Sequence, residues 1–266
     1  MLSRVRSAVR PFLVICLLIA LLAPAASWAT GHSEGAARAS GLADRLMEAL
    51  GGADAWAAAR HVQFNFFGFR NHDWDRHTGD HRLEGFTREG QHYVVLHNIE
   101  SREGGAWVDG EAQSGEELAE WLERAYGAWV NDVYWLAMPY KLKDPGVTLA
   151  YDGTETIDGV DYEKVKLSFE QVGLTPGDVY WAYLHPETGL MAYWAYFLQS
   201  WEADREPTRW AWTDWNEYAG VQLSTTRVGA DGSARSLGPI AVSTEIADPA
   251  VFTDPAARME RPKTDG

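Results

Sequence analysis

Residues 178–199 read DVYWAYLHPETGLMAYWAYFLQ, and this stretch decides the fold of the chain. The pattern predicts one long β-hairpin with its turn at His185–Gly189. Proline presets φ for such a turn, and glycine supplies the positive φ needed before the return strand. The two strands of this hairpin should therefore pair in an antiparallel sheet.

Both faces of the predicted hairpin are apolar or aromatic. Because side chains alternate along a strand, the outgoing strand should carry on its two faces Val179, Trp181 and Tyr183, and Tyr180, Ala182 and Leu184. The return strand should carry Met191, Tyr193 and Phe197 on one face, and Leu190, Trp194, Tyr196 and Leu198 on the other. Such a sheet must be covered on both faces, or covered once and left to line an internal cavity.

The N-terminal segment 1–29 has the composition of a Sec-type signal peptide. Three arginines precede the apolar run Phe12–Leu22, and small residues lead to an expected cleavage site near Ala29. A membrane anchor is the less favoured alternative, because the run has 11 residues and a spanning helix needs about 20. The single cysteine, Cys16, lies in this segment, so the mature chain should contain no disulfide.

The chain is strongly acidic. Loss of residues 1–29, which contain three arginines and no acidic residue, would change the net charge from −15 to −18. A negative surface of this size repels phosphate backbones and anionic lipid headgroups, so nucleic-acid binding is disfavoured. No second apolar run is long enough to cross a bilayer, and we expect a soluble periplasmic or secreted product.

The remaining chain should form one domain. Residues 30–40 are small and polar and indicate a flexible N-terminus, and residues 256–266 form a polar tail. Between them, 41–255 contains no proline- or serine-rich linker. It should begin with a short helix, Leu42–Leu50, that Gly51–Gly52 terminates.

Strands on either side of one long helix predict an α+β protein built on an antiparallel sheet. The helix should begin near Ser114, with Glu117 at the capping-box spacing, and run to Met138 before Pro139. Its second half is apolar nearly all round, so it should be buried on most sides. The expected strands are 62–69, 82–86, 91–98, 106–108, 147–151, 155–157, 162–169, the two hairpin strands, 208–218, 221–228 and 240–246.

Aromatic residues exceed what one ordinary core uses, since twelve tryptophans follow Ala29. Tryptophan and tyrosine on strands are commonly core residues, but we favour a cavity lined by aromatic faces. The candidate cavity residues are Phe64, Phe66, Trp121, Trp129, Trp135, Trp181, Tyr183, Trp194 and Tyr196.

Asn131 and Asp132 interrupt the apolar half of the long helix, where an unpaired carboxylate would be costly to bury. They are candidates for a polar hook that holds a ligand headgroup at the mouth of the cavity. The favoured alternative is structural, a buried tie from the helix to strand backbone or to Lys141 or Lys143.

The densest polar cluster is 71–81, NHDWDRHTGDH, which contains His72, Asp73, Asp75, His77, Asp80 and His81. These residue types can bind a divalent metal ion, but their spacing matches no metal motif. A solvated hairpin connection is the favoured interpretation. The sequence has no G-x-S-x-G elbow, glycine-rich phosphate loop or H-E-x-x-H helix, so we predict no catalytic residues, no metal and no cofactor.

Three segments carry a resemblance to a known group: 129–147 (WVNDVYWLAMPYKLKDPGV), 167–199 (LSFEQVGLTPGDVYWAYLHPETGLMAYWAYFLQ) and 246–255 (IADPAVFTDP). With the order of elements, they resemble a domain-of-unknown-function branch of the LolA/LolB-like periplasmic lipoprotein carriers and outer-membrane lipoprotein receptors. The resemblance implies an unclosed antiparallel half-barrel wrapped around the long helix as plug or lid, with an apolar cavity for acyl chains.

The predicted function is therefore that of an exported, soluble binding protein, not an enzyme. It should hold a lipid, an acyl chain or a lipoprotein tail in the half-barrel, as in outer-membrane lipoprotein sorting, and an envelope protein is a further expected partner. Two alternatives stay open at this point. One is a metal-dependent hydrolase that uses the cluster 71–81, and the other is an envelope sensor or scaffold that binds a protein partner.

Overall fold

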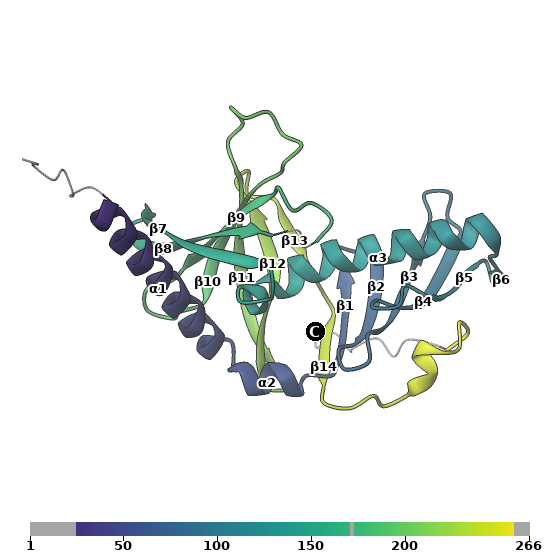
Figure 1. Cartoon of the computed structure of the whole chain (residues 1–266). Coiled ribbons are helices and arrows are strands. Elements are labelled where there is room, and N and C mark those ends of the chain that lie inside the picture. The colour runs from purple at the N-terminus through teal and green to yellow at the C-terminus, as the bar shows by residue number, and fades with distance from the viewer. Residues whose placement is uncertain (1–24, 171–172, 258–266) are drawn as a thin grey trace, which may run out of the picture.

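The protein is an α+β structure in which two open antiparallel sheets are arranged along one long helix (Figure 1). The computed structural model describes residues 25–170 and 173–257. Within these ranges, each sheet has seven strands and neither sheet closes on itself. The predicted fold class, an unclosed antiparallel sheet structure around a long helix, is confirmed, with the strands divided between two sheets.

The first sheet, sheet A, takes most of its strands from the first half of the chain. Its order is β14 (Ile240–Ser243), β1 (His61–Phe66), β2 (Arg70–Asp75), β3 (Asp80–Phe86), β4 (His92–Asn98), β5 (Gly104–Val108) and β6 (Glu111–Ala112). Strands β1 to β6 follow one another as a meander, and β14 returns from the C-terminal part to pair with β1.

The second sheet, sheet B, is a meander of the second half of the chain. Its order is β13 (Ala234–Ser236), β12 (Val221–Gly229), β11 (Thr208–Tyr218), β10 (Met191–Phe197), β9 (Val179–Leu184), β8 (Val160–Phe169) and β7 (Val147–Ile157). The helices are α1 (Ala25–Ala49), α2 (Ala53–Ala58), α3 (Gly115–Ala137) and two short 3-10 helices, η1 (Met138–Lys141) and η2 (Pro249–Phe252).

The long helix α3 crosses both sheets (Figure 1). Its first half packs on the inner face of sheet A in a cluster formed by Leu83, Tyr93, Val95, Ala106, Leu118, Trp121, Leu122, Ala125 and Ala128. Its second half carries Val133, Leu136 and Ala137 into the main core, which sheet B and α1 share. One helix therefore supplies the apolar layer for two sheets.

The ends of α3 lie close to their predicted positions. Ser114 is the N-cap residue in extended backbone, but its side chain makes no capping hydrogen bond, so the expected capping box does not form. Glu116 and Glu117 lie in the first turn, where their charges are favourable for the helix dipole. The α-helix ends at Ala137, and Pro139 lies inside η1.

Helix α1 is longer than the sequence predicted, because Ala25–Ala49 also includes residues that were expected to form a flexible N-terminus. Its C-terminal half buries Leu42 and Leu46 in the main core, and Leu50, just after the helix, is buried with them. As predicted, glycine terminates it: Gly51 has φ of 106°, and a Cβ there would lie 2.0 Å from the carbonyl oxygen of Gly220.

The β9–β10 hairpin has the predicted alternation, with one local exception. Tyr180 of β9 and Trp194 of β10 face inward, and Trp181 and Tyr193 face outward. A register irregularity between Met191 and Tyr193 interrupts the alternation, so that Ala192 and Tyr193 both face outward. The sequence had suggested that Met191 and Tyr193 share one face. Met191 is instead fully buried in the main core, on the opposite face from Tyr193.

The polar segment 71–81 is not a solvated connection, and that expectation is wrong. Most of it belongs to strands β2 and β3, and the turn between the strands is confined to 76–79. Alternation divides its side chains between the two faces of sheet A. His72 and His81 contact each other on the inner face, and Asp73 contacts His61 on the other face.

The outer face of sheet A is covered by the segment 248–257, which follows β14 and includes η2. Arg82 of β3 is 1% exposed and holds this segment. Its guanidinium donates to the carbonyl oxygens of Val251, Asp254, Pro255 and Ala257 at 3.0–3.3 Å. One buried side chain therefore fixes most of the C-terminal segment.

Two predicted segments lie wholly or partly outside the described residues: the signal segment 1–29, of which 1–24 are outside, and the polar tail 256–266, of which 258–266 are outside. Among the helices of the described part, none combines the length and the apolar character that a transmembrane span requires.

Replacing Arg82 with methionine should release the C-terminal segment, because four backbone carbonyl groups lose their donor. We expect the free energy of unfolding to fall by about 2–4 kcal/mol. Amide hydrogen exchange across 249–257 should become faster than in the unmodified protein. The same replacement at Arg88, which is exposed, should leave both quantities nearly unchanged. Equal exchange rates in the two variants would show that Arg82 does not hold the C-terminal segment in place.

Candidate functional site

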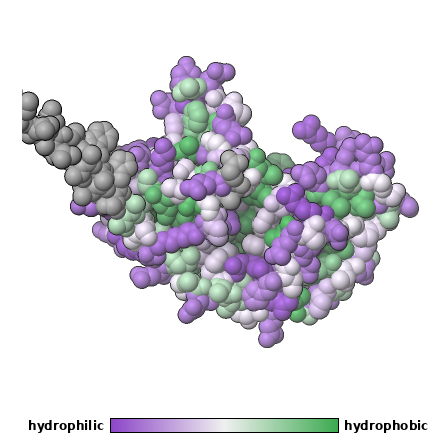
Figure 2. All heavy atoms as spheres, in the orientation of Figure 1, coloured by the Kyte–Doolittle hydropathy of each residue, from purple (hydrophilic) through white to green (hydrophobic). Residues whose placement is uncertain are grey.

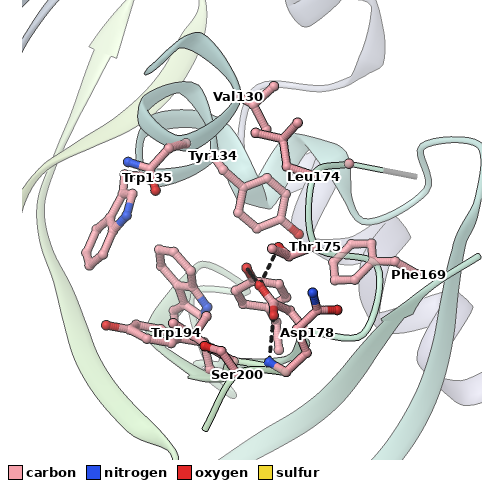
Figure 3. Close-up of a pocket in the computed structure, with 15 residues that line it drawn as sticks. Val130, Tyr134, Trp135, Phe169, Leu174, Thr175, Asp178, Trp194 and Ser200 are labelled. Carbon is pink, nitrogen blue, oxygen red and sulfur yellow. Dashed lines mark hydrogen bonds between the residues drawn. The ribbon is translucent and has the colours of Figure 1, made fainter. Parts of the chain in front are cut away.

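A pocket lies between the second half of α3 and the inner face of sheet B (Figure 3). Its volume is about 430 Å³, within the range of about 300–1,000 Å³ that is usual for small-molecule sites. The described residues that line it are Val130, Asn131, Tyr134, Trp135, Phe169, Gly173, Leu174, Thr175, Asp178, Tyr180, Trp194, Tyr196, Leu198, Gln199 and Ser200.

Helix α3 supplies one wall of the pocket through residues spaced one turn apart. Val130 and Tyr134 form one such pair, and Asn131 and Trp135 form the next. Side chains at this spacing lie on the same helix face, so the wall is a direct consequence of helical periodicity. The opposite wall comes from the strands.

Strands β8 to β10 form the opposite wall because their inward-facing residues are aromatic. Tyr180 from β9 and Trp194 from β10 have ring centroids 5.6 Å apart, and the ring of Tyr134 lies 5.3 Å from Tyr180. Trp135 packs on Trp194 at 4.7 Å in an edge arrangement. Such contacts contribute beyond simple area burial, and they fix the ring positions. The wall is therefore preformed.

The main polar group of the pocket is Asp178, which is 3% exposed and lies immediately before β9. One carboxylate oxygen accepts hydrogen bonds from Thr175 Oγ1 at 2.6 Å and from the Tyr180 hydroxyl at 3.2 Å. The other accepts from the backbone N–H of Gln199 at 2.8 Å. Both oxygens are thus engaged, and the carboxylate joins the loop before β9 to the loop after β10.

Two donors in the pocket lack a partner. The hydroxyl of Tyr134 and the Nε1–H of Trp194 are buried and have no hydrogen-bond partner among the described residues. Burial, with a smaller contribution from Tyr180, raises the pKa of Tyr134 well above its ordinary value of 10, so its hydroxyl stays protonated. The indole N–H groups of Trp74, Trp129, Trp210 and Trp212 are buried and unpaired in the same way, so the lack of a partner does not distinguish the pocket from the core.

Val130 and Leu174 lie next to each other at one edge of the pocket in Figure 3. Leu174 is 51% exposed, which is unusual for a large apolar side chain. Apolar residues also gather near the centre of the molecular face drawn in Figure 2.

The structure brings four of the predicted site residues to this pocket: Trp135, Trp194, Tyr196 and Asn131. The other predicted cavity residues lie elsewhere. Phe64 and Phe66 belong to the main core, Trp129 packs on Trp74, and Trp121 packs on Tyr93. Their role as cavity residues stays a prediction, and their positions give them packing partners of their own.

Trp181 and Tyr183 lie on the outer face of sheet B, away from the pocket. Their indole and hydroxyl groups donate to Asp152 and Glu155 on β7. Sequence reasoning assigned these two residues to the same set as Trp194. Alternation alone shows that two faces exist, but it does not show which face is concave.

Sequence reasoning did not single out Tyr134, Phe169 or Asp178 as lining residues. The inward position of Tyr180 did follow from strand alternation, although Tyr180 was not among the candidates. The spacing of Tyr134 from Val130, one helical turn, was available as a signal. Asp178 had no such signal, because its partners come from loops.

Asp132 points away from the pocket and toward sheet A. It is fully buried, and its carboxylate accepts two hydrogen bonds from Arg70 at 2.5 and 2.7 Å and one from His72 Nε2 at 2.8 Å. A structural tie was the favoured interpretation, and its partners are side chains of β2, not Lys141 or Lys143. Asn131 also donates to Asp132, at 2.8 Å.

A chain of histidines continues from Asp132 across sheet A. His72 Nδ1 lies 3.0 Å from His81 Nε2, and His81 Nδ1 lies 2.8 Å from His97 Nε2. If Asp132 accepts from His72, each neutral imidazole has one N–H to give to the ring before it. Three neutral rings therefore satisfy every hydrogen bond in the chain, and His97 Nδ1 ends it without a partner among the described residues.

The surroundings keep these histidines neutral. Burial lowers the pKa of His97 to about 4 and lowers the pKa of His81 well below 6.5, with further lowering from neighbouring histidines. Burial also lowers the pKa of His72, against the opposing effect of Asp132. Burial raises the pKa of Asp132, but hydrogen bonds from Arg70 and His72 outweigh it, and the net pKa is lowered.

The metal-dependent alternative finds no donor set in the described residues, where no group of three or more His, Cys, Asp or Glu side chains is arranged to hold a metal ion. Within 71–81, His72 and His81 are already engaged in the histidine chain. Asp73 is bound to His61 and Gln63, and Asp75 to Arg60. This cluster is better explained as structural.

Residues 110–220 match the model of a family of unknown function, DUF6503. No curated protein matches the chain.

Several solved structures match. A DUF1329 family protein from Desulfovibrio piger has a TM-score of 0.44 at 13% identity, covering 82% of this chain and 97% of that one. A structure described as an outer-membrane lipoprotein-sorting protein domain, from Vibrio parahaemolyticus, has a TM-score of 0.39 at 7% identity, covering 79% and 97%. A LolA superfamily protein from Nitrosomonas europaea has a TM-score of 0.32 at 9% identity, covering 74% and 93%. These neighbours include the group that the sequence resembles.

Replacing Asp132 with asparagine should strongly destabilise the protein, because Arg70 and His72 lose the charge that pairs with them. We expect a loss of about 3 kcal/mol in the free energy of unfolding, measured by chemical denaturation. Glu123→Gln is the matched control on the same helix, because the Glu123 ion pair with Arg102 is exposed. It should cost less than about 1 kcal/mol. Similar losses in both variants would show that the buried tie has no special role.

The histidine chain should make the protein acid-labile. In the unfolded chain each imidazole takes up a proton near pH 6.5, whereas His97 in the folded protein does so near pH 4. The unfolded state therefore binds more protons between these values, and stability that is present above pH 6.5 is lost as the pH falls.

For His97 this loss should amount to about 1–2 kcal/mol between neutral pH and pH 5. Urea denaturation across that range should show a shallower pH dependence for His97→Gln than for the unmodified protein. His77→Gln, which changes an exposed histidine, should retain the full dependence. If stability depends on pH in the same way in all three proteins, His97 is not the source of the acid lability.

Proposed function

We propose that this protein is an exported, soluble binding protein that holds a lipid, an acyl chain or a lipoprotein tail in the pocket between α3 and sheet B. The observation that carries this proposal is the pocket itself, a preformed space of about 430 Å³ with an aromatic and aliphatic lining. Apolar lining with a few fixed polar groups is the usual character of a small-molecule site.

Burial of hydrocarbon supplies enough free energy for such binding. Each buried methylene contributes about 0.8 kcal/mol, so about ten methylenes contribute about 8 kcal/mol. Part of this gain is offset by the loss of translational and rotational freedom. The rigid aromatic wall reduces the further cost of ordering side chains on binding.

The lining residues favour binding and release over catalysis. Among those described, Asp178 is the only one whose side chain ordinarily ionises at neutral pH, and both of its oxygens already accept hydrogen bonds from the protein. These hydrogen bonds tie the Asp178 carboxylate to the segments on either side of the β9–β10 hairpin. An exported location, an envelope protein partner and participation in lipoprotein sorting belong to this proposal, and they rest on the sequence resemblance and the signal-like N-terminus.

Native mass spectrometry of residues 30–266, purified without detergent, tests the proposal directly. We expect extra mass that organic solvent removes and that is identified as lipid. Protein that is delipidated and then offered a fluorescent fatty acyl probe should bind it at one site. Bare polypeptide mass together with no probe binding would refute the proposal.

Filling the pocket should abolish this binding. Val130→Trp places a large ring in the pocket wall that α3 supplies, and we expect at least a tenfold loss of probe affinity. Val160→Trp is the matched control, because Val160 is also half-buried but packs on the outer face of sheet B. It should bind the probe normally, and thermal unfolding should confirm that both variants fold. Equal binding by both variants would exclude this pocket as the site.

A further inference from the structure

The histidine chain meets α3 between the two apolar regions of the helix. The cluster on sheet A includes α3 as far as Ala128, and Val133 already belongs to the main core. Between these regions, the Asp132 side chain joins the helix to β2 through Arg70 and His72. The contact of α3 with β2 is therefore polar at this point, and its strength depends on the charges of a few groups.

The hydrogen bonds of the chain run in one direction. A carboxylate only accepts, so His72 donates to Asp132 from Nε2. His72 Nδ1 then accepts from His81 Nε2, and His81 Nδ1 accepts from His97 Nε2. Asp132 thus selects the tautomer of every ring. His97 Nδ1 remains as a buried acceptor with no partner among the described residues.

This chain has room for one added proton. It can reside at His97 Nδ1, or another ring can carry the charge after protons shift along the chain. A second added proton would place two N–H groups against each other across a contact of 2.8–3.0 Å, which is repulsive. Asp132 offers no further position, because Arg70, His72 and Asn131 donate to both of its oxygens. Protonation of all three rings therefore requires that they separate.

The surroundings oppose even the first proton. Burial is the largest effect on each ring, and it lowers the pKa of His97 to about 4. Arg70 and Arg102 add to this lowering, and Asp132 opposes it at His72. The charged and titratable groups that act on the rings, directly or through a neighbour, are Arg70 and Asp73 of β2, Tyr93 of β4, Arg102 in the turn before β5, and Glu123, Arg124, Tyr126 and Asp132 of α3.

We propose that His72, His81, His97 and Asp132 form an acid-sensitive latch, in which proton uptake separates α3 from β2 and thereby disrupts the pocket on the other side of the helix. In the open form water reaches the imidazoles, and each ring binds a proton with an ordinary pKa near 6.5. The closed form is fully favoured above that pH and loses this advantage as the pH falls toward 4. Each histidine shifts the equilibrium about 20-fold toward the open form between pH 7 and pH 5.

Opening should be local, and it should reach the pocket. The second half of α3 remains attached to sheet B, where the carbonyl oxygen of Trp135 accepts from Arg227. Val130 and Tyr134 line the pocket and lie roughly opposite Asp132 on the helix. Without the hold of Asp132 on sheet A, the rotation of this wall is no longer fixed. Release of a ligand in acid rests on the proposed binding function, whereas the latch itself does not.

Hydrogen–deuterium exchange on residues 30–266 tests the latch without a ligand. After correction for the intrinsic effect of pH, we expect residues 128–135 of α3 to open at least about 100-fold more often at pH 5 than at pH 7, with β10 still protected. His97→Gln keeps a donor toward His81 but cannot take up a proton, so it should reduce this change about 20-fold. His77→Gln, at an exposed histidine, should retain the full change. An unchanged α3, or an equal loss of protection in β10, would overturn the inference.

Imidazole nitrogen NMR tests the same arrangement in the unmodified protein, independently of how well a variant folds. At pH 7.5 the three buried rings should be neutral, with the proton on Nε2 and with Nδ1 unprotonated. A buried ring with its proton on Nδ1, or one that is already a cation at this pH, would rule out the directed chain on which the latch depends.

The effect on the pocket is measured with an uncharged fluorescent alkyl probe, whose own charge does not change with pH. We expect at least tenfold weaker binding at pH 5 than at pH 7, a smaller loss in His97→Gln and the full loss in His77→Gln. If α3 opens but probe affinity stays constant, the coupling of the latch to the pocket is refuted. If the probe binds at neither pH, the proposed binding function is refuted, and hydrogen exchange alone decides whether the latch exists.

Discussion

The buried contact of Asp132 with Arg70 and His72 fixes the rotation of α3, and the pocket depends on that rotation. With about 100° per residue, Val130 and Tyr134 lie roughly opposite Asp132 on the helix. When Asp132 is held against β2 of sheet A, these two residues must face sheet B. A buried ion pair is weak support for stability in itself, but it is a strong constraint on orientation, because removing one partner leaves an unpaired charge.

A second buried cation holds the same helix from the other side. Arg227 of β12 is fully buried, and its guanidinium donates to the carbonyl oxygen of Trp135 near the C-terminal end of α3 at 2.6 Å. It also lies 3.4 Å from the ring centroid of Trp212 and donates to Ser224 Oγ at 2.7 Å. Burial lowers the pKa of Arg227 well below its ordinary value. The Arg227 guanidinium interacts there with the negative C-terminal end of the α3 dipole and with the face of the Trp212 indole. Arginines from both sheets thus bind one helix.

Much of this architecture could be predicted from the sequence because it follows from local periodicity. The start of α3 after Ser114, the end of α1 at Gly51 and the inward set of Tyr180, Trp194 and Tyr196 are all local patterns. The tie at Asp132 could not be predicted in the same way, since Arg70 precedes it by 62 residues.

The two largest departures from the sequence expectation have physical causes. Strand β2 was missed because its run of polar residues resembles a loop. His72 can be buried there because it forms hydrogen bonds with His81 and Asp132. Met191 was misplaced because a register irregularity shifts the side-chain alternation by one position. Both depend on neighbouring strands, which no single segment specifies.

The outer face of sheet B shows how a hairpin that is aromatic on both sides can be accommodated without a second covering layer. Tyr183 is buried there, yet no helix packs over it in the described residues. Long charged side chains cover it: Lys164 lies over its ring at 5.4 Å and pairs with Glu155, which also binds Arg209. Their aliphatic stems cover apolar surface and their charged ends remain near solvent. The inner face can then be covered by one helix, and the space that α3 does not fill becomes the pocket. The aromatic excess that first suggested a cavity is thus divided between a wall that a ligand can contact and an outer surface that the protein covers with its own charges.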